Sequence, residues 1–94
     1  SRLREVTMDF KTNGVVVSLA GRDKGKLLAV MRIDDGHVYV CDGKERPLLK
    51  PKRKNVKHVR ALQYVLSSEK TVSDPALRKA LLEIRGHMPK ESEV

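Results

Sequence analysis

Three apolar runs separated by two glycine-containing breaks fill the stretch Val15–Asp42, and this pattern limits the folds open to the chain. The first run, Val15–Ala20, is rich in β-branched residues and has no helical period. The second break, Asp34-Asp35-Gly36, contains an Asp-Gly pair. Such a pair favours a type I′ hairpin turn, because both central residues there need positive φ. The stretch therefore predicts three consecutive strands joined by tight turns.

The two later runs of this stretch differ in pattern. Lys26–Ile33 is apolar almost throughout, which predicts a central strand covered on both faces. His37–Cys41 alternates, so Val38 and Val40 are expected on one face and the remaining residues on the other. Strands of these two kinds fit a small curled sheet or a tight barrel.

Two further short strands are predicted after this meander. Arg46–Leu49 is the fourth, and Pro47 restricts it to an edge or a strand start. Val56–Gln63 is the fifth, with Asn55 in the turn before it. The sheet is therefore expected to have about five strands.

The C-terminal third has a helical pattern. Ser73-Asp74-Pro75 is a helix-start signal, since Ser or Asp caps the free amides and Pro fits the first turn. Gly86 is expected to stop the helix, and Pro89 prevents its continuation. An apolar stripe at helical spacing is formed by Leu77, Ala80, Leu81 and Ile84. The helix is therefore amphipathic and is expected to dock on the sheet.

These elements predict one small, mainly β domain with a C-terminal amphipathic α-helix. Val6, Met8 and Phe10 alternate ahead of the turn signal Asn13-Gly14, which allows a leading edge strand. The expected organisation is an N-terminal tail or leading strand, the barrel, and a linker with helix and tail, at residues 1–13, 14–63 and 64–94.

Positive charge is concentrated in one connected segment. The chain of 94 residues has 20 Lys and Arg against 12 Asp and Glu, a net charge of +8. Lys44–Arg60 contains eight of these cations and one acid, Glu45, so it accounts for +7 of that charge. A balance this basic in a small domain favours a polyanionic partner, nucleic acid before a membrane surface. The alternative is a protein that is basic without such a partner.

The first glycine break, Gly21–Lys26, is a basic loop suited to a phosphate backbone. Its glycines permit close approach, and Arg22, Lys24 and Lys26 can donate charge-assisted hydrogen bonds to phosphate oxygens. The loop does not match a nucleotide-binding P-loop, because three residues separate the glycines instead of four and Leu27 follows the lysine. The alternative is a hairpin turn that happens to be basic.

No catalytic or metal-binding arrangement is visible. Cys41 and His37 share a strand face, but four residues of extended chain put them about 13 Å apart, too far to hold one metal ion. Cys41, the single cysteine, is expected to be a small packing residue and suits a reducing compartment. Asp34 and Asp35 are adjacent turn residues whose side chains diverge. We therefore expect no enzyme activity, no metal and no cofactor.

Aromatic residues are scarce, with Phe10, Tyr39 and Tyr64 the only ones. Proteins that bind single strands usually present several aromatic platforms, and proteins that bind proline motifs or methyl-lysine need aromatic grooves or cages. The preferred ligand is therefore folded RNA, recognised by its shape and backbone charge.

The residues 15–42 resemble a KOW motif, the strand–loop–strand signature of several ribosomal proteins and transcription-elongation factors. Gly25 stands where the characteristic glycine of the motif stands, and the resemblance extends over Gly14–Arg85. It includes Ala20-Gly21-Arg22-Asp23-Lys24-Gly25, the lysine run before Val56-Lys57-His58, and Arg78-Lys79-Ala80-Leu81. The chain resembles the small bacterial relatives of archaeal and eukaryotic large-subunit ribosomal KOW proteins, without the long C-terminal extension of the eukaryotic ones.

The resemblance implies an SH3-like barrel that binds ribosomal RNA without catalysis, as a cytoplasmic ribosomal or ribosome-associated protein. Its expected partner is structured RNA of the large ribosomal subunit, with no membrane and no small-molecule substrate, and the protein is expected to be monomeric off the ribosome. The expected RNA-binding residues are Gly21, Arg22, Lys24, Gly25, Lys26, Lys44, Arg46, Lys50, Lys52, Arg53, Lys54, Lys57, His58 and Arg60.

Two other functions fit parts of the pattern. A KOW module of a transcription or translation factor can dock on another protein, in which case exposed apolar residues would matter more than the cations. The run Lys50–Lys54, KPKRK, also matches a nuclear-import signal, although such runs arise by chance in RNA-binding proteins.

Overall fold

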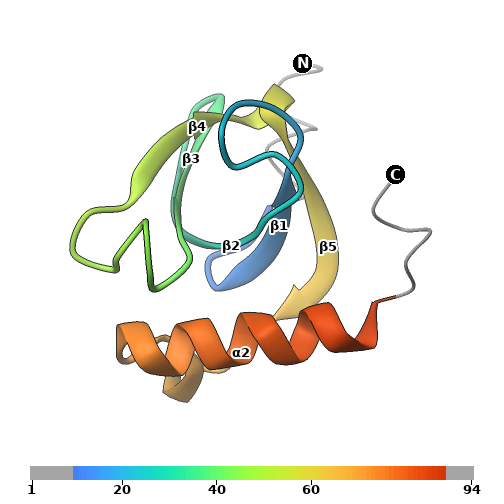
Figure 1. The fold of residues 1–94 in the computed structure, drawn as a ribbon. Helices are drawn as coiled ribbons and strands as arrows, with labels where there is room; N and C mark the ends of the chain where they lie inside the picture. The colour runs from blue at the N-terminus through green and yellow to red at the C-terminus, as the bar shows by residue number, and fades with distance from the viewer. Residues whose placement is uncertain (1–9, 89–94) are drawn as a thin grey trace.

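The computed structural model describes residues 10–88, a mainly β domain with one α-helix (Figure 1). The strands are β1 (Gly14–Ser18), β2 (Leu27–Asp34), β3 (His37–Cys41), β4 (Lys52–Asn55) and β5 (Val59–Val65). Two 3-10 helices, η1 (Val56–His58) and η2 (Ser68–Thr71), follow β4 and β5, and α2 (Asp74–His87) follows η2. Val6 and Met8 of the expected leading strand lie outside the described residues.

All five strands form one antiparallel sheet in the order β4-β3-β2-β1-β5. The predicted mainly β class, the number of strands and the C-terminal helix are therefore confirmed. The sheet curls, and α2 lies across one end of it (Figure 1). It is not closed into a barrel, because the edge strands β4 and β5 form no ladder with each other and are joined through η1.

Both faces of the sheet are buried. The inner core, within the curl, consists of Phe10, Val16, Leu28, Val30, Val38, Val40, Val56 and Val59. The outer core, between the sheet and α2, consists of Val15, Val17, Leu27, Ala29, Cys41, Leu66, Leu77, Ala80 and Leu81. Successive residues at the start of β2 thus enter opposite cores, which confirms the expectation of a central strand covered on both sides.

Helix α2 begins where the sequence predicts and ends later. The side chain of Ser73 accepts a hydrogen bond from the N–H of Ala76 at 3.2 Å, which confirms the predicted N-cap. The predicted stop at Gly86 is wrong, since the helix continues through this residue. The helix ends at His87, and the backbone of Met88 is extended, because the residue before Pro89 is disfavoured in the helical conformation.

The fourth and fifth strands lie further along the chain than predicted. Arg46–Leu49 is not a strand, because two consecutive turns hold this part of the chain. The carboxylate of Asp42 accepts hydrogen bonds from the N–H groups of Lys44 and Arg46, at 2.9 and 2.8 Å, and the N–H of Lys50 donates to the carbonyl of Pro47 at 2.9 Å. The predicted strand Val56–Gln63 begins instead as η1 and becomes β5 only at Val59.

The turns support the predicted meander with one correction. The N–H of Gly14 donates to the carbonyl of Lys11 at 2.8 Å, and Asn13 has a φ of 68°, which confirms the turn before β1. Asp35 and Gly36 connect β2 to β3, but only Gly36 has positive φ (77°). The predicted type I′ turn, which needs positive φ at both residues, is therefore wrong.

Candidate functional site

The loop between β1 and β2, Leu19–Lys26, is a compact structure that we call the glycine loop. The N–H of Gly25 donates to the carbonyl of Ser18 at 2.8 Å, and the N–H of Lys24 donates to that of Gly21 at 3.2 Å. Gly21 and Gly25 have φ of 81° and 85°, in the left-handed region that glycine enters without steric cost. The backbone of the loop is therefore shaped before any ligand binds.

Asp23 points inward from the glycine loop and ties it to two other segments. Its Oδ2 lies 3.6 Å from Nη2 of Arg46 and 4.0 Å from Nζ of Lys54. The Lys54 ammonium also donates a hydrogen bond to the carbonyl of Ala20 at 3.2 Å. Asp23 and Lys54 are 3% and 8% exposed, so their charges attract more strongly than those of a surface pair. The carboxylate of the only acidic residue in the loop is thus buried and paired with cations inside the protein.

Lys54 is buried because of its position in the register of the sheet. It lies opposite Val38, a residue of the inner core, so its side chain points into the curl. Its neighbour Arg53 points the other way and is exposed. The alternation along β4 thus separates two cations that the sequence predicts together in one RNA-binding segment.

The other predicted residues are mostly on the surface. Those that are exposed are Gly21, Arg22, Lys24, Gly25, Lys26, Lys44, Lys50, Arg53, Lys57, His58 and Arg60. Lys52 and Arg46 are partly buried. The N–H of Leu19 donates to the carbonyl of His58 at 2.8 Å, so the glycine loop contacts η1 as well as β4. The fold therefore brings the loop and the second half of the basic segment together.

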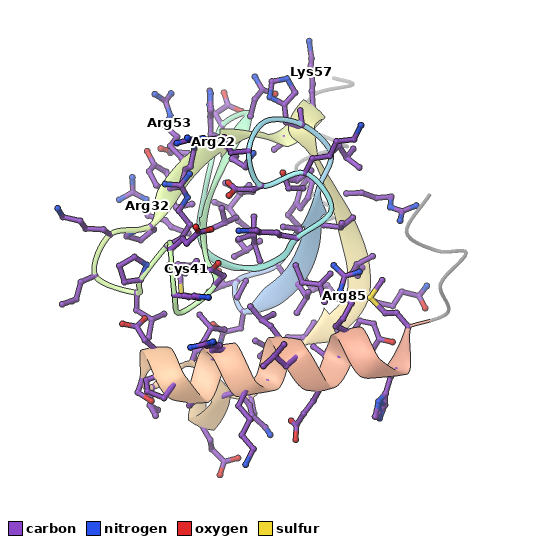
Figure 2. All side chains as sticks on the ribbon, in the orientation of Figure 1. Arg22, Arg32, Cys41, Arg53, Lys57 and Arg85 are labelled. Carbon is purple, nitrogen blue, oxygen red and sulfur yellow. The ribbon has the colours of Figure 1, made fainter. Side chains whose placement is uncertain are left out.

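We call this part of the surface the basic end. It consists of Arg22, Lys24, Arg53, Lys57 and His58, from the glycine loop, β4 and η1. Arg22, Arg53 and Lys57 lie at the end of the curled sheet away from α2 (Figure 2). A phosphate chain at this end would therefore meet cations from three separate elements.

The opposite side of the glycine loop contacts α2 and the turn after β3. Nζ of Lys26 donates to Oε1 of Glu45, and this hydrogen bond raises the pKa of Lys26 and lowers the pKa of Glu45. Nη2 of Arg85, a side chain of α2 that is labelled in Figure 2, donates to the carbonyl of Gly25. The loop is thus fixed on both sides, which limits how far it can move when a ligand binds.

A cleft of about 310 Å³ lies between this side of the loop and α2. Its cationic lining residues are Lys26, Lys44, Arg78 and Arg85. Arg78 and Arg85 were not among the predicted RNA-binding residues, because only the docking of α2 against the loop brings them beside Lys26 and Lys44. Two of the predicted cations, Lys26 and Lys44, thus line this cleft and are not part of the basic end.

Cys41 is a packing residue, as predicted. It is fully buried in the outer core, and its Sγ–H donates to the carbonyl of Pro47 at 3.4 Å. Burial above all, and then the carboxylates of Asp74 and Asp42, raise the pKa of the thiol to about 11. Such a thiol is a poor nucleophile at neutral pH.

We expect Cys41 to resist thiol reagents in the native protein. A rise of the pKa from 9.0 to about 11 leaves a thiolate fraction about 100-fold smaller, and burial blocks access as well. Labelling by Ellman's reagent at pH 8 should be slow in buffer and fast in urea. Because the folded state prefers the neutral thiol, stability should also decline as the pH rises from 9 towards 11. Fast labelling of the native protein would contradict this expectation.

No protein-family model matches the chain. Among residues 10–88, no cluster of three or more His, Cys, Asp or Glu side chains is placed to hold a metal ion. None of the described helices is both long enough and apolar enough to cross a membrane. The function is therefore inferred from the geometry and charge of the glycine loop and its neighbours.

Proposed function

We propose that the protein is a non-catalytic, KOW-type RNA-binding module that holds the backbone of structured RNA. The observation that carries this proposal is the basic end. A preformed glycine loop turns its one acid, Asp23, inward and leaves Arg22 and Lys24 exposed, and Arg22 lies at the same end of the sheet as Arg53 and Lys57 (Figure 2). The KOW-like sequence supports ribosomal RNA of the large subunit as the target and the ribosome in the cytoplasm as the place of action.

Backbone recognition suits the residue types at this end. Arg and Lys donate charge-assisted hydrogen bonds to phosphate oxygens, and the exposed glycines of the loop leave room for a backbone to approach. On the other side of the loop, Gly25 also has no atom within 4 Å of the position that a Cβ would occupy, so the space beside it is open. Phosphate contacts of this kind position a protein on RNA by shape and give a strong dependence on salt.

The proposal predicts a steep salt dependence of RNA affinity. If Arg22, Lys24, Arg53 and Lys57 each neutralise one phosphate, log K should fall against log salt with a slope of about −3 to −4. Replacing Arg22, Arg53 and Lys57 by Gln should reduce the magnitude of this slope by about 2 to 3. Fluorescence anisotropy with a labelled, structured ribosomal RNA fragment over a KCl series measures both.

A matched variant separates the basic end from net charge alone. Lys11, Lys70 and Lys79 are exposed lysines outside the glycine loop, β4 and η1, and replacing all three by Gln removes the same charge. This control should keep most of the affinity and slope. Equal losses in the two triple variants would place the interface elsewhere, and a slope near zero for the wild type would overturn the proposal.

A protein-interaction module is the second candidate, and one observation favours it. Leu49 is 94% exposed at the loop before β4, so its side chain is accessible to a partner. If this loop docks on a protein partner, Leu49→Ser should abolish that binding while the Gln variants of the basic end leave it intact. If RNA is the partner, the Gln variants of the basic end should lower RNA affinity and Leu49→Ser should leave it intact.

A further inference from the structure

A row of three side chains crosses the outward face of β2, β3 and β4. The register puts Arg32 opposite Tyr39, and Tyr39 opposite Arg53. Tyr39 lies between Val38 and Val40, which both enter the inner core, so its own side chain is on the other face of the sheet. Arg32 and Arg53 lie on the side of the molecule away from Arg85 and α2 (Figure 2).

Tyr39 is the one aromatic residue that belongs to neither core. Phe10 is buried in the inner core, and Tyr64 packs against the outer core. Tyr39 remains partly exposed, and neither hydrophobic cluster includes it. The packing of the domain therefore does not account for an aromatic ring at this position.

Arg32 covers the ring of Tyr39 and keeps most of its own surface in solvent. Its Cζ lies 4.1 Å from the ring centroid, a cation–π contact. Its Nη2 lies 3.7 Å from Oδ2 of Asp34, and its side chain remains 66% exposed. The guanidinium is therefore held from one side by the ring and from its edge by a carboxylate, with exposed surface left for a further contact.

We propose that Arg32, supported by Tyr39, is a stacking platform for one unpaired nucleobase of RNA. Bases that leave a helix stack on aromatic rings and on guanidinium planes, because every base has a π face. Asp34 disfavours a phosphate directly over Arg32, whereas Arg53 on the far side of Tyr39 can hold the neighbouring phosphate. This inference rests on the proposed function, since Arg53 also belongs to the basic end.

The platform adds a preference for RNA with an unpaired base, which contacts to the phosphate backbone cannot supply. Cations at the basic end bind phosphates of any sequence and of paired or unpaired RNA alike. A guanidinium held over a tyrosine instead selects an unpaired base, at a single position. The scarcity of aromatic residues argued against a protein that stacks a long single strand, and one platform is consistent with a single extruded base on an otherwise folded RNA.

Two hairpin RNAs test the platform. One carries a single bulged 2-aminopurine, an adenine analogue whose fluorescence reports its stacking, and the other lacks the bulge. We expect the wild-type protein to bind the bulged hairpin about tenfold more tightly than the paired one, and to change the 2-aminopurine emission. Both hairpins should show the same salt slope, because their phosphate contacts are shared.

Three variants test which side chains produce the preference for the bulged hairpin. Arg32→Lys keeps the charge but loses the planar guanidinium, so it should lose most of the tenfold preference and leave the affinity for the paired hairpin unchanged. Tyr39→Leu should lose the preference as well, since the guanidinium loses its support. Arg78→Lys, the same substitution on α2, should behave as the wild type. Circular dichroism spectra that match the wild type exclude unfolding as the cause.

The outcomes distinguish this inference from the proposed function. Equal affinity of the wild type for the two hairpins overturns the platform and leaves backbone binding in place. An unchanged preference in both Arg32→Lys and Tyr39→Leu also overturns it. If neither hairpin binds, RNA binding itself fails and the platform fails with it.

Discussion

Asp23→Ala is expected to lower the free energy of unfolding by about 3 kcal/mol. The substitution removes the carboxylate that lies 4.0 Å from the Lys54 ammonium and 3.6 Å from the Arg46 guanidinium. Lys54, only 8% exposed, would then be a buried charge without an opposite charge, and this costs more than the intact pair contributes. Urea denaturation followed by far-ultraviolet circular dichroism measures the change.

Two companion variants show whether the unpaired charge is the cause. Lys54→Met in the Asp23→Ala background removes that charge and keeps the aliphatic stem, so most of the lost stability should return. Glu45→Ala breaks the exposed pair with Lys26 and should leave the urea midpoint unchanged, because solvent screens such pairs. A single Asp23→Ala variant as stable as the wild type would contradict a buried role for this carboxylate.

Strands that carry a strong apolar pattern could be predicted from the sequence. His37–Cys41 was predicted with its correct bounds and with Val38 and Val40 on one face, because alternation of polar and apolar residues leaves one register. The expected two-sided burial of β2 is likewise confirmed, since its apolar run fits only a strand between two cores. Here local pattern and tertiary burial agree.

β4 could not be found in this way. Its sequence, Lys52–Asn55, is entirely polar and has low strand propensity, so pairing with β3 determines its conformation. The sequence predicts a strand at Arg46–Leu49 in its place, yet hydrogen bonds to the Asp42 side chain and to the carbonyl of Pro47 hold that part of the chain in turns. A strand whose conformation depends on pairing with its neighbour need not show any alternation of polar and apolar residues in its own sequence.

The candidate site shows the same limit. The glycine loop and the basic segment were both recognised, but the inward position of Asp23 and Lys54 depends on contacts between distant parts of the chain. Arg32 was missed because it lies outside the basic segment and becomes notable only when the register places it over Tyr39. A count of charges identifies the basic residues, but the sheet register determines which of them are exposed on the same face.

Gly43→Ala is expected to destabilise the fold by more than about 2 kcal/mol, although a single methyl group is added. Gly43 has a φ of 81°, where alanine alone costs about 1–2 kcal/mol. The new Cβ would also overlap the carbonyl oxygen of Asp74 and lie 3.1 Å from the N–H nitrogen of Arg78. Both atoms are backbone of α2, so the start of the helix must move and withdraw Leu77 from the outer core. Thermal or urea unfolding measures the loss.

Gly25→Ala is the matched control, because it has the same backbone strain without the overlap. Its φ is 85°, and no atom lies within 4 Å of the added Cβ. It should therefore cost only the strain of about 1–2 kcal/mol, and Gly43→Ala should be clearly the less stable of the two. If the two variants were equally stable, close docking of α2 on the turn after β3 would not be the reason for glycine at position 43.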